Sequence, residues 1–405
     1  MPEGKTIVLG VTGGIAAYKA VELASKLTQE GMKINTIMTN AATKLVSPLT
    51  FQAITGRPVF TEIFDSTASF QINHISLAGT ADVIVVAPAT ANTLAKIAGG
   101  FGDNLLCCTI LASKAPVIIA PAMNTNMYDN LATQDNLARL KDRHFAIIKP
   151  ASGRLASGIK GTGRLAEIET ILDSIHQILG KNGDLAGKQI VITAGGTQEF
   201  IDPVRYITNR SSGKTGYSLA NAARDRGARV TLISAPCALR EPAGIDIFQV
   251  RTAEEMYHAT KDNITRADAL IMAAAVSDYR PQTISAKKIK KKSSFITLEM
   301  EPTRDILNSI KGDFLRVGFA AESDHVIENA ALKLKQKKLD FIVANDITSN
   351  DSGFESDDNK VTIIDCSGEK TSLPLMPKRE VAEHILDKVA FLLEQREQLR
   401  KRESE

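Results

Sequence analysis

The chain has 405 residues, of which 43% are apolar and 23% are charged, and its formal net charge is +3. This length favours two or three domains, each large enough to bury its own core. The small net charge gives no general attraction to nucleic acid or to membranes. No segment approaches the ~18 apolar residues of a membrane span, so we expect neither partner.

The cysteines and the N-terminus indicate a cytoplasmic protein. Four cysteines stand at 107, 108, 237 and 366, without the CxxC pairs of a zinc site or the spacing of a disulfide framework. We expect reduced thiols. Residues 6–9 read as a strand almost at the start, which leaves no apolar core for a signal peptide.

The first half alternates short apolar runs with helical patterns. The run Ile7–Val11 predicts a strand, residues 15–30 a helix that Gly31 ends, and Ile34–Met38 the next strand. Two further apolar runs, 83–87 and 117–120, are followed by proline, as buried parallel strands often are. This alternation predicts a doubly wound α/β domain.

A domain boundary is expected near residue 185. An amphipathic helix at about 165–179 is followed by the polar, glycine-rich connector 180–184. A new strand, Gln189–Thr193, then begins the second half and meets the pair Gly195-Gly196. We therefore expect one domain over residues 1–185 and another over residues 186–405.

The second half repeats this logic with an insertion. We expect a long loop at 197–215, a helix at about 216–226 and a strand at 230–234. Three more buried strands are predicted at 270–275, 317–321 and 341–344, and a last helix at about 378–397.

Two glycine turns are candidate phosphate sites. A strand, a Gly pair and a helix N-terminus at Thr12–Ile15 suit an anion, although a tight turn without a ligand is the open alternative. Gly213-Lys214-Thr215 suggests a P-loop, but that motif needs a glycine where Thr208 stands. The P-loop interpretation therefore fails.

Three segments of the first half indicate a particular family when they are taken together, although each alone is a weak signal. They are Thr12–Ile15, Ala87–Asn92 and Pro121–Tyr128, and His74 lies between the first two. With His74 they resemble the homo-oligomeric flavin-containing cysteine decarboxylases. The segment PAMNTNMY at 121–128 matches that family's PxMNxxMW pattern, except that Tyr128 replaces the tryptophan.

The second half resembles the phosphopantothenate–cysteine ligases. The segments that carry this resemblance are DPVR at 202–205, Asn209, SSGK at 211–214, AAAVSDY at 273–279, KIKK at 288–291 and GFAAE at 318–322. The two resemblances cover nearly the whole chain, in the order of the bifunctional coenzyme A biosynthesis family. They imply two doubly wound, Rossmann-like α/β domains, of which the first is a flavodoxin-like flavin domain.

For the first domain, the resemblance implies FMN as cofactor and phosphopantothenoylcysteine as substrate. Flavin oxidation of the cysteine moiety gives a thioaldehyde, carbon dioxide leaves, and the electrons return to the enethiolate to give phosphopantetheine. The implied FMN contacts are Gly13, Gly14, Thr39, Ala89, Thr90, Ala91, Asn92 and Ala122.

Two residues match catalytic positions of the decarboxylases. His74 matches the catalytic base, a task that suits an imidazole near neutral pH. Asn124 matches the residue that holds the substrate carboxylate, as an amide donor can. The alternatives are a histidine without a catalytic role and an Asx turn after Pro121.

One position departs from the family pattern. The substrate flap of these decarboxylases carries a cysteine, in a pattern like ACGxxGxGR, that protonates the enethiolate. Here Ser157 stands at that place in ASGIKGTGR, and a hydroxyl is a far weaker acid than a thiol. The proton donor is therefore unassigned, although the glycines still predict a mobile lid.

For the second domain, the resemblance implies that CTP activates the carboxylate of 4'-phosphopantothenate as an acyl-cytidylate, which the amine of cysteine attacks. Asn209 matches the residue that stabilises this intermediate. The positions that match the CTP site are Met272, Ala273, Ala274, Asp278, Lys288, Arg304, Asp305, Ile306, Leu307, Phe319, Lys333 and Lys337.

The basic run 287–292 suits a triphosphate, because several ammonium groups can offset its charge. The alternatives are a solvated basic segment and a nucleic-acid patch. A magnesium ion is expected with the triphosphate, but the sequence contains no dedicated carboxylate cage to supply its ligands.

Two rival functions remain open on the sequence. One is an oxidative cysteine decarboxylase that stops at the enethiol, which Ser157 motivates. The other is a flavin-binding regulatory subunit without catalysis, against which His74 and Asn124 argue. The resemblance to the bifunctional family also implies a homo-oligomer, with trimers through the flavin domain and dimers through the ligase domain.

Overall fold

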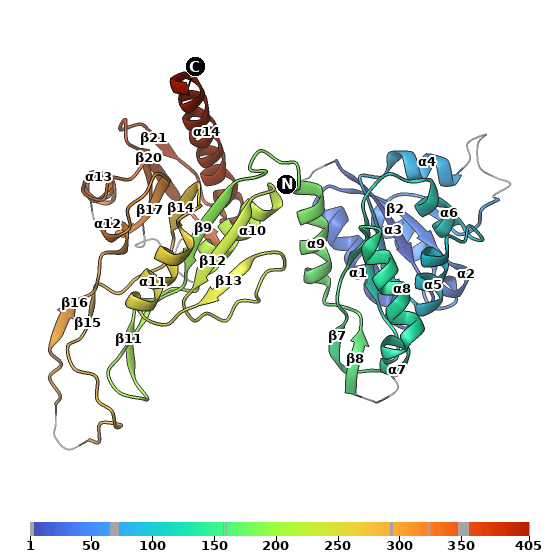
Figure 1. Ribbon diagram of the computed structural model, residues 1–405, viewed down its shortest axis with the longest axis horizontal. Coiled ribbons are helices and arrows are strands. Elements are labelled where there is room, and N and C mark those ends of the chain that lie inside the picture. The colour runs from blue at the N-terminus through green and yellow to red at the C-terminus, as the bar shows by residue number, and fades with distance from the viewer. Residues whose placement is uncertain are drawn as a thin grey trace. The chain divides into compact units, whose positions relative to one another are not determined.

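The computed structural model describes residues 4–64, 73–156, 158, 160–291, 295–322, 325–346 and 356–404. The chain divides into two compact units, Met1–Gly180 and Lys181–Glu405 (Figure 1). Each unit has its own sheet and its own buried apolar clusters. No helix in the described part of the chain combines the length and the apolar character that crossing a membrane requires.

The first unit is built on a parallel sheet in the order β3-β2-β1-β4-β5-β6. Its strands are β1 (Thr6–Val11), β2 (Lys33–Met38), β3 (Val59–Phe60), β4 (Val83–Ala89), β5 (Val117–Pro121) and β6 (Ala146–Ile147). Without the two-residue β3, the remaining strands follow the flavodoxin-like order. The order reverses between β1 and β4, so the switch point at which such folds bind ligands lies at their carboxyl ends.

Helices cover both faces of this sheet. Ile7 and Leu9 of β1 join a buried cluster with α1, α3 and α9, whereas Val8 joins a second cluster with α5, α6 and α8. The helices are α1 (Ala17–Gln29), α2 (Asn40–Thr43), α3 (Pro48–Thr55), α4 (Asn73–Thr80), α5 (Ala91–Gly99), α6 (Leu105–Ala112), α7 (Thr125–Asp129), α8 (Leu131–Asp142) and α9 (Ile168–Gly180). A hairpin of β7 (Ala151–Arg154) and β8 (Lys160–Arg164) precedes α9.

The second unit has a larger sheet in the order β13-β12-β9-β14-β17-β18-β20-β21. The strands are β9 (Gln189–Ala194), β12 (Arg229–Ser234), β13 (Asp246–Gln249), β14 (Ala269–Met272), β17 (Leu315–Glu322), β18 (Phe341–Asp346), β20 (Val361–Asp365) and β21 (Lys370–Ser372). The first six are parallel and follow the Rossmann order, and the last two are antiparallel. The switch point lies between β9 and β14.

Short hairpins and helices complete the second unit. The short antiparallel pairs are β10 (Gln198–Phe200) with β11 (Tyr206–Thr208), β15 (Tyr279–Pro281) with β16 (Met300–Pro302), and β19 (Asp358–Asn359) with β22 (Met376–Pro377). The helices are α10 (Lys214–Asp225), α11 (Ala253–Asn263), α12 (Ile306–Ser309), α13 (Val326–Gln336) and α14 (Lys378–Ser404).

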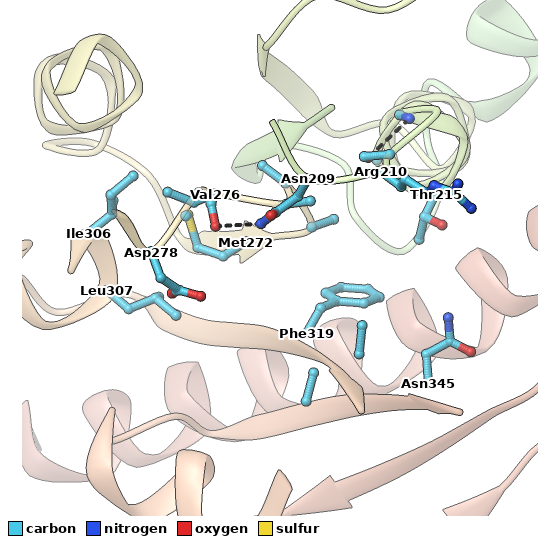
Figure 2. Close-up of a pocket in the computed structure, with 18 of the residues that line it drawn as sticks. Asn209, Arg210, Thr215, Met272, Val276, Asp278, Ile306, Leu307, Phe319 and Asn345 are labelled. Carbon is cyan, nitrogen blue, oxygen red and sulfur yellow. Dashed lines mark hydrogen bonds between the residues drawn. The ribbon is translucent and has the colours of Figure 1, made fainter. Parts of the chain in front are cut away.

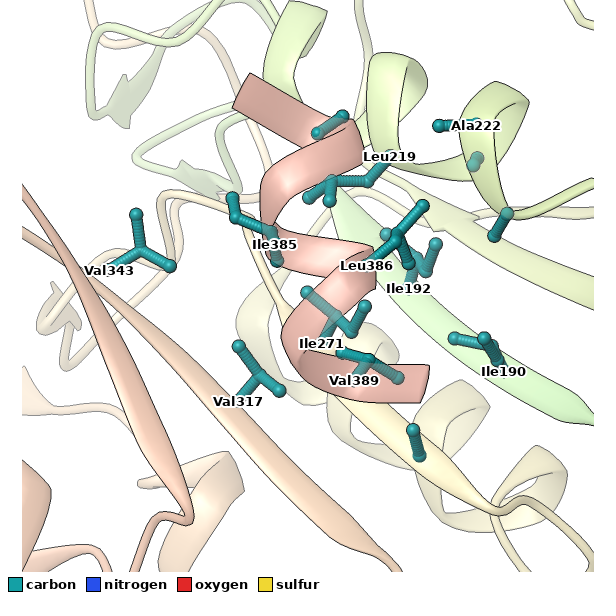
Figure 3. Close-up of a cluster of buried hydrophobic side chains, with 14 of the residues drawn as sticks. Ile190, Ile192, Leu219, Ala222, Ile271, Val317, Val343, Ile385, Leu386 and Val389 are labelled. Carbon is teal, nitrogen blue, oxygen red and sulfur yellow. The ribbon is translucent and has the colours of Figure 1, made fainter. Parts of the chain in front are cut away.

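Helix α14 closes one face of the second sheet. Its buried residues Ile385, Leu386 and Val389 are fully enclosed and belong to the same cluster as Val317 of β17 and Leu219 of α10 (Figure 3). Burial of this apolar stripe is the main attraction between the helix and the sheet.

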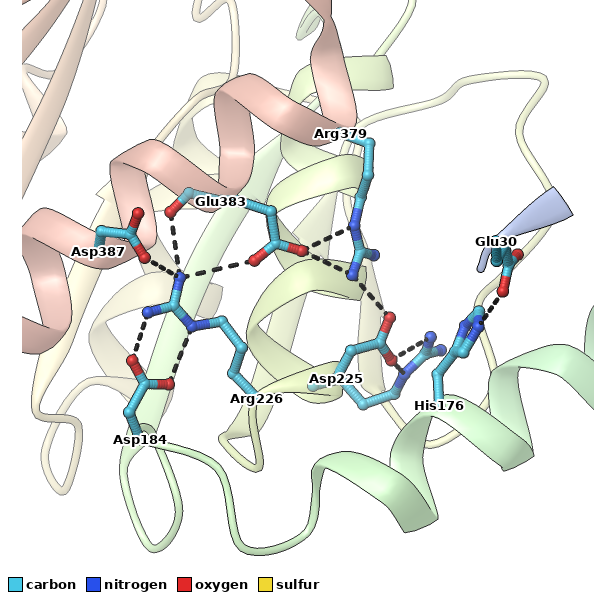
Figure 4. A network of polar contacts seen from close by, with 9 residues as sticks. Glu30, His176, Asp184, Asp225, Arg226, Arg379, Glu383 and Asp387 are labelled. Atoms are coloured by element: carbon cyan, nitrogen blue, oxygen red, sulfur yellow. Dashed lines mark hydrogen bonds and ion pairs between the residues drawn. The ribbon is translucent and has the colours of Figure 1, made fainter. Parts of the chain in front are cut away.

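A network of ion pairs fastens the first turns of α14 (Figure 4). The Arg226 guanidinium binds the Asp184 carboxylate and reaches Asp387 at 2.8 Å. Arg379 binds Asp225 at 2.9 Å, and the side chain of Asp225 is only 4% exposed. Because a buried carboxylate is costly without its partner, these pairs fix where α14 begins relative to α10.

The predicted class of two doubly wound α/β domains is confirmed, and local differences have clear causes. The expected loop 197–215 contains the hairpin β10–β11, and α10 begins at Lys214, two residues before its expected start. The expected strand 270–275 ends at Met272, because the following residues leave the ladder to form the switch-point turn.

We expect the second unit to lose stability in acid through Asp365. Burial alone would raise the pKa of this carboxyl, but hydrogen bonds from Lys388, Ser367 and the Glu369 amide lower it to about 2. The folded pKa lies below the ordinary 3.8, so the stabilisation is complete above that pH and is lost as the pH falls towards 2. It corresponds to about 2 kcal/mol.

Calorimetry of the full chain at a series of pH values measures this effect. Asp365→Asn should lower the melting temperature at pH 7, and the difference from the parent should shrink as the pH falls through 2, because protonation of Asp365 removes the stabilisation. Asp313→Asn is the matched control, since Asp313 is 80% exposed in its pair with Arg400. An equal difference between Asp365→Asn and the parent at every pH would contradict the prediction.

Candidate active sites

A buried threonine joins the two turns at the switch point of the first unit. The Thr12 hydroxyl donates to the Pro88 carbonyl oxygen at 2.6 Å and accepts from the Thr90 amide at 3.1 Å. Thr12 is 1% exposed, so both bonds are shielded from water. The end of β1 and the end of β4 are thereby held side by side.

Most of the predicted flavin positions meet at this edge. A Cβ on Gly14 would stand 3.6 Å from the Thr90 methyl group and 3.9 Å from the Ala122 carbonyl oxygen. Thr39 follows β2, and its amide donates to the Val11 carbonyl oxygen at 3.0 Å. Gly13 packs directly against Ala41 of α2. Residues from the ends of four parallel strands therefore converge.

This edge suits the phosphate of a mononucleotide. Helix α1 begins at Ala17 without a side-chain cap, and the free N–H groups of a helix N-terminus attract anions. Helix α5, in contrast, is capped by the Thr90 hydroxyl. Among the predicted contacts, Ala89 is wholly buried, whereas Asn92 is exposed.

The predicted catalytic residues of the first unit lie on helix starts. His74 is the second residue of α4, and its Nδ1 atom is buried without a hydrogen-bond partner in the described part of the chain. Asn124 is the N-cap of α7, and its Oδ1 accepts from the Asn126 amide at 2.9 Å. The Asx turn proposed as the alternative for Asn124 is thus present.

The flap sequence forms the hairpin β7–β8 over the segment that carries Asn124. The Met123 amide donates to the Gly163 carbonyl oxygen at 2.9 Å. Gly163 has φ +139°, and a side chain there would collide with the Met123 carbonyl oxygen, so only glycine permits this approach. Ser157, the substituted flap position, lies outside the described residues.

A cavity of about 250 Å³ opens beside Thr39 and reaches Asp103 and Asn104. It is smaller than a whole flavin mononucleotide would need. Exposed apolar side chains adjoin predicted site residues in sequence: Ile15 follows Gly14, Ile75 follows His74, and Met127 lies three residues after Asn124.

Hydroxyl groups also join the turns at the switch point of the second unit. The Ala274 amide donates to the Thr193 hydroxyl at 3.1 Å, and the Ser277 amide to the Thr197 hydroxyl at 2.9 Å. The Ala275 amide donates to the Gly195 carbonyl oxygen at 2.8 Å. The ends of β9 and β14 are therefore tied together, as in the first unit.

A cavity of about 490 Å³ lies at this switch point (Figure 2). It brings together Asn209 and most of the predicted nucleotide positions. Those that line it are Met272, Ala273, Ala274, Asp278, Arg304, Asp305, Ile306, Leu307, Phe319, Lys333 and Lys337. In Figure 2, Asp278 and Leu307 lie at one end and Asn345 at the other, with Asn209 between them. The Asn209 amide donates to the Val276 carbonyl oxygen at 3.1 Å.

The wall opposite Asp278 is positively polarised. Helix α10 begins at Lys214 without a side-chain cap and lies close to β9, since a Cβ on Gly216 would stand 2.5 Å from that of Ala194. Lys214 pairs with Asp357 at 2.7 Å. Lys378 is 5% exposed, and burial together with the Lys214 charge lowers its pKa. An anionic group would be attracted to this wall.

Two predicted cations at the other end already have partners. The Arg304 guanidinium lies 4.5 Å from the Tyr257 ring centroid and 3.4 Å from the Glu254 carboxylate. The Lys337 ammonium lies 3.6 Å from the Asp305 carboxylate. These contacts hold the long side chains at the cavity wall rather than in solvent.

Lys288 is the one predicted nucleotide residue that does not line this cavity. It is exposed on the segment between β15 and β16. Within the described residues, no three His, Cys, Asp or Glu side chains gather as the ligands of a metal ion would.

Sequence reasoning missed several cavity residues, among them Asn345, Asn359 and Lys378. Ser212 and Lys214 also line the cavity, and the sequence marked them as part of the SSGK segment without assigning them a site role. The rejected P-loop match was a partial signal, because α10 does present its N-terminus to the cavity although no Walker motif is present. Asn345 lies in β18, directly after the predicted apolar run 341–344, and its Oδ1 is buried without a partner among the described residues. A polar residue at the end of an apolar run was the available clue.

Comparison with known families agrees with this architecture. The Flavoprotein family matches residues 1–180, and the family described as DNA/pantothenate metabolism flavoprotein C-terminal domain matches residues 185–392. The fold and sites thus define a flavoprotein unit joined to a second doubly wound unit with a ligand cavity.

Whole-length relatives give the particular family. The chain is 45% identical to the Coenzyme A biosynthesis bifunctional protein CoaBC of Bacillus subtilis, over 98% of this chain and 99% of the relative. It is 41% identical to the protein of that name from Escherichia coli strain K12, over 95% and 97%. A solved C-terminal domain of such a protein is 41% identical and covers 53% of this chain and 99% of its own, with a TM-score of 0.46.

The chain belongs to the family of bifunctional coenzyme A biosynthesis proteins. It is therefore an enzyme acting on small molecules, with a decarboxylase activity and a ligase activity.

We expect Thr12→Val to weaken flavin binding and to destabilise the first unit by about 1–3 kcal/mol, because it leaves a buried amide and a carbonyl unpaired. Visible flavin absorbance of the purified protein and thermal unfolding measure the two effects. Thr36→Val is the matched control: its hydroxyl is buried without a partner in the described residues, so its loss should be neutral. Equal behaviour of the two variants would refute the role of Thr12.

Proposed function

We propose that residues 186–405 ligate cysteine to 4'-phosphopantothenate with CTP, and that residues 1–185 decarboxylate the product to 4'-phosphopantetheine with FMN. The observation that carries the proposal is the cavity of about 490 Å³, whose wall contains Asn209 and eleven predicted nucleotide positions. These positions come from five separated segments of the chain. Their convergence at a switch point supports a nucleotide site.

In the proposed ligase reaction, Asn209 stabilises the acyl-cytidylate. Its amide is oriented by the Val276 carbonyl oxygen, so its other groups can contact a ligand in the cavity. Met272–Ala274 offer backbone groups to the base, and Lys333 and Lys337 offer ammonium groups to phosphates. Asp278 lines the same cavity as a nucleotide-binding residue, and magnesium is expected to accompany the triphosphate.

In the proposed decarboxylation, the bound flavin supplies the transfer of electrons from and back to the substrate. The uncapped start of α1 holds the phosphate at Gly13 and Gly14, and Thr39 adds a hydroxyl. His74 takes up a proton from the substrate, and its Nδ1 has no hydrogen-bond partner among the described residues that would compete for that proton. Asn124 binds the substrate carboxylate.

We further propose that the flavin site is completed by a second copy of the chain. Ile15, Ile75 and Met127 expose large apolar side chains beside the predicted site residues, with exposed fractions of 66%, 53% and 49%. Exposed large apolar side chains are often part of interaction surfaces. A homo-oligomer in the cytoplasm is the assembly that fits these features.

The function is tested with the purified full chain. A flavin spectrum, formation of pyrophosphate that requires CTP, cysteine and 4'-phosphopantothenate together, and a mass matching 4'-phosphopantetheine are expected. Flavin binding without either reaction would instead favour a regulatory subunit. A colourless chain that leaves CTP intact would overturn the proposal for both units.

We expect Ser157→Cys to raise the rate of 4'-phosphopantetheine formation by roughly 10-fold or more, because a thiol is a much stronger general acid than a hydroxyl. The ligase rate of the same chain is the internal control and should not change. Mass spectrometry also separates the final product from the enethiol, which is lighter by two hydrogen atoms. An unchanged rate would mean that another group or water donates the proton.

A further inference from the structure

A buried carboxylate ties the turn before Asn209 to the basic run that contains Lys288. Asp202 is wholly buried, and its Oδ1 accepts from the Val204 and Arg205 amides, each at 2.8 Å. Its other oxygen, Oδ2, accepts from the Ile289 amide at 3.1 Å. One carboxylate thus closes its own turn and holds a segment 87 residues further along the chain.

Arg205 binds Ile289 as well, and we call Asp202 and Arg205 together the clamp on Ile289. Its guanidinium donates to the Ile289 carbonyl oxygen at 3.0 Å and lies 3.5 Å from Asp202 Oδ2. Both backbone polar groups of Ile289 are therefore bound by the same turn. A third link is the Ser285 amide, which donates to the Ile201 carbonyl oxygen at 3.0 Å.

The clamp lies between two groups proposed to act on one ligand. Ile289 directly follows Lys288, whose exposed side chain has no ion pair within the described residues. On the other side, strand β11 leads from Arg205 to Asn209 in the cavity wall. The four residues from Arg205 to Asn209 span at most about 14 Å. The backbone that Arg205 and Asp202 bind at Ile289 therefore lies within about the length of a nucleoside triphosphate of the cavity wall.

We infer that Asp202 is a positioning residue of the ligase: it holds the backbone at Ile289 so that Lys288 is presented towards the triphosphate bound near Asn209. This inference rests on the proposed function, in which Lys288 binds the nucleotide. Asp202 itself, being wholly buried, does not touch CTP. Burial would raise the pKa of its carboxyl, but the hydrogen bonds from Val204, Ile289 and Arg205 lower it, so it is charged at neutral pH.

Asp202→Asn separates the two halves of the clamp. An amide oxygen in the place of Oδ1 keeps both turn bonds, whereas the NH₂ group in the place of Oδ2 faces the Ile289 N–H and the guanidinium, donor against donor. We expect the KM for CTP to rise roughly 10-fold. The decarboxylase activity of the same chain should be unchanged. Asp313→Asn is the matched control.

A double-mutant cycle with Lys288→Ala tests whether Asp202 acts through Lys288. The double variant should have the same KM for CTP as Lys288→Ala alone, because Asp202 then has no Lys288 ammonium group left to position. If the two single effects multiply instead, or if Asp202→Asn matches the parent, the inference is overturned. If Lys288→Ala does not change the KM for CTP and the chain still ligates, the inference about Asp202 is also overturned, but the proposed function is not. A parent chain that consumes no CTP overturns the proposed function.

If Asp202→Asn does not fold, Ile289→Pro tests the same bond from the other side. Proline lacks the N–H that Asp202 binds and leaves the turn intact. We expect the same rise in KM as for Asp202→Asn, and no rise for Ile284→Pro, the control on the same exposed segment. Equal effects of the two proline variants would overturn the inference.

Discussion

A buried hydroxyl group that crosses the switch point of a parallel sheet is the constraint on which both sites depend. Two strands that diverge there have no ladder bonds beyond their ends, so their turns would separate without another tie. Thr12 supplies that tie between β1 and β4, and Thr193 and Thr197 supply it between β9 and β14. Beside each of these hydrogen-bonded turns, small residues from neighbouring strand ends lie close together.

The sheets were predictable because their strands are buried on both faces and read as apolar runs. Ile7–Val11 and Gln189–Thr193 each end at a glycine pair, which marked both switch points. The hairpins β10–β11 and β15–β16 were not predictable, because short strands outside the main sheets carry no apolar run. The antiparallel strands β20 and β21 were not predicted either, because the sequence there shows no clear periodicity of apolar residues.

Site residues could be predicted only where they belong to a sequence motif of the family. Asn209 and Phe319 came from the family resemblance, and the structure brings both to one cavity. Lys378 could not be predicted, because a lysine at the start of a helix normally faces water. Its burial depends on where α14 docks, and that depends on pairs such as Arg379 with Asp225. Likewise, nothing in the sequence alone indicates that Asp202 binds Ile289.

Helix α14 contributes both core packing and a cavity residue, and it is the last element of the chain. The buried clusters of the first unit come from residues 7–175, so its core does not depend on α14. The nucleotide cavity of the second unit does depend on it, because its wall lacks Lys378 until α14 has docked. Loss of α14 would therefore open both the second core and a cavity wall, and would leave the core of the first unit complete.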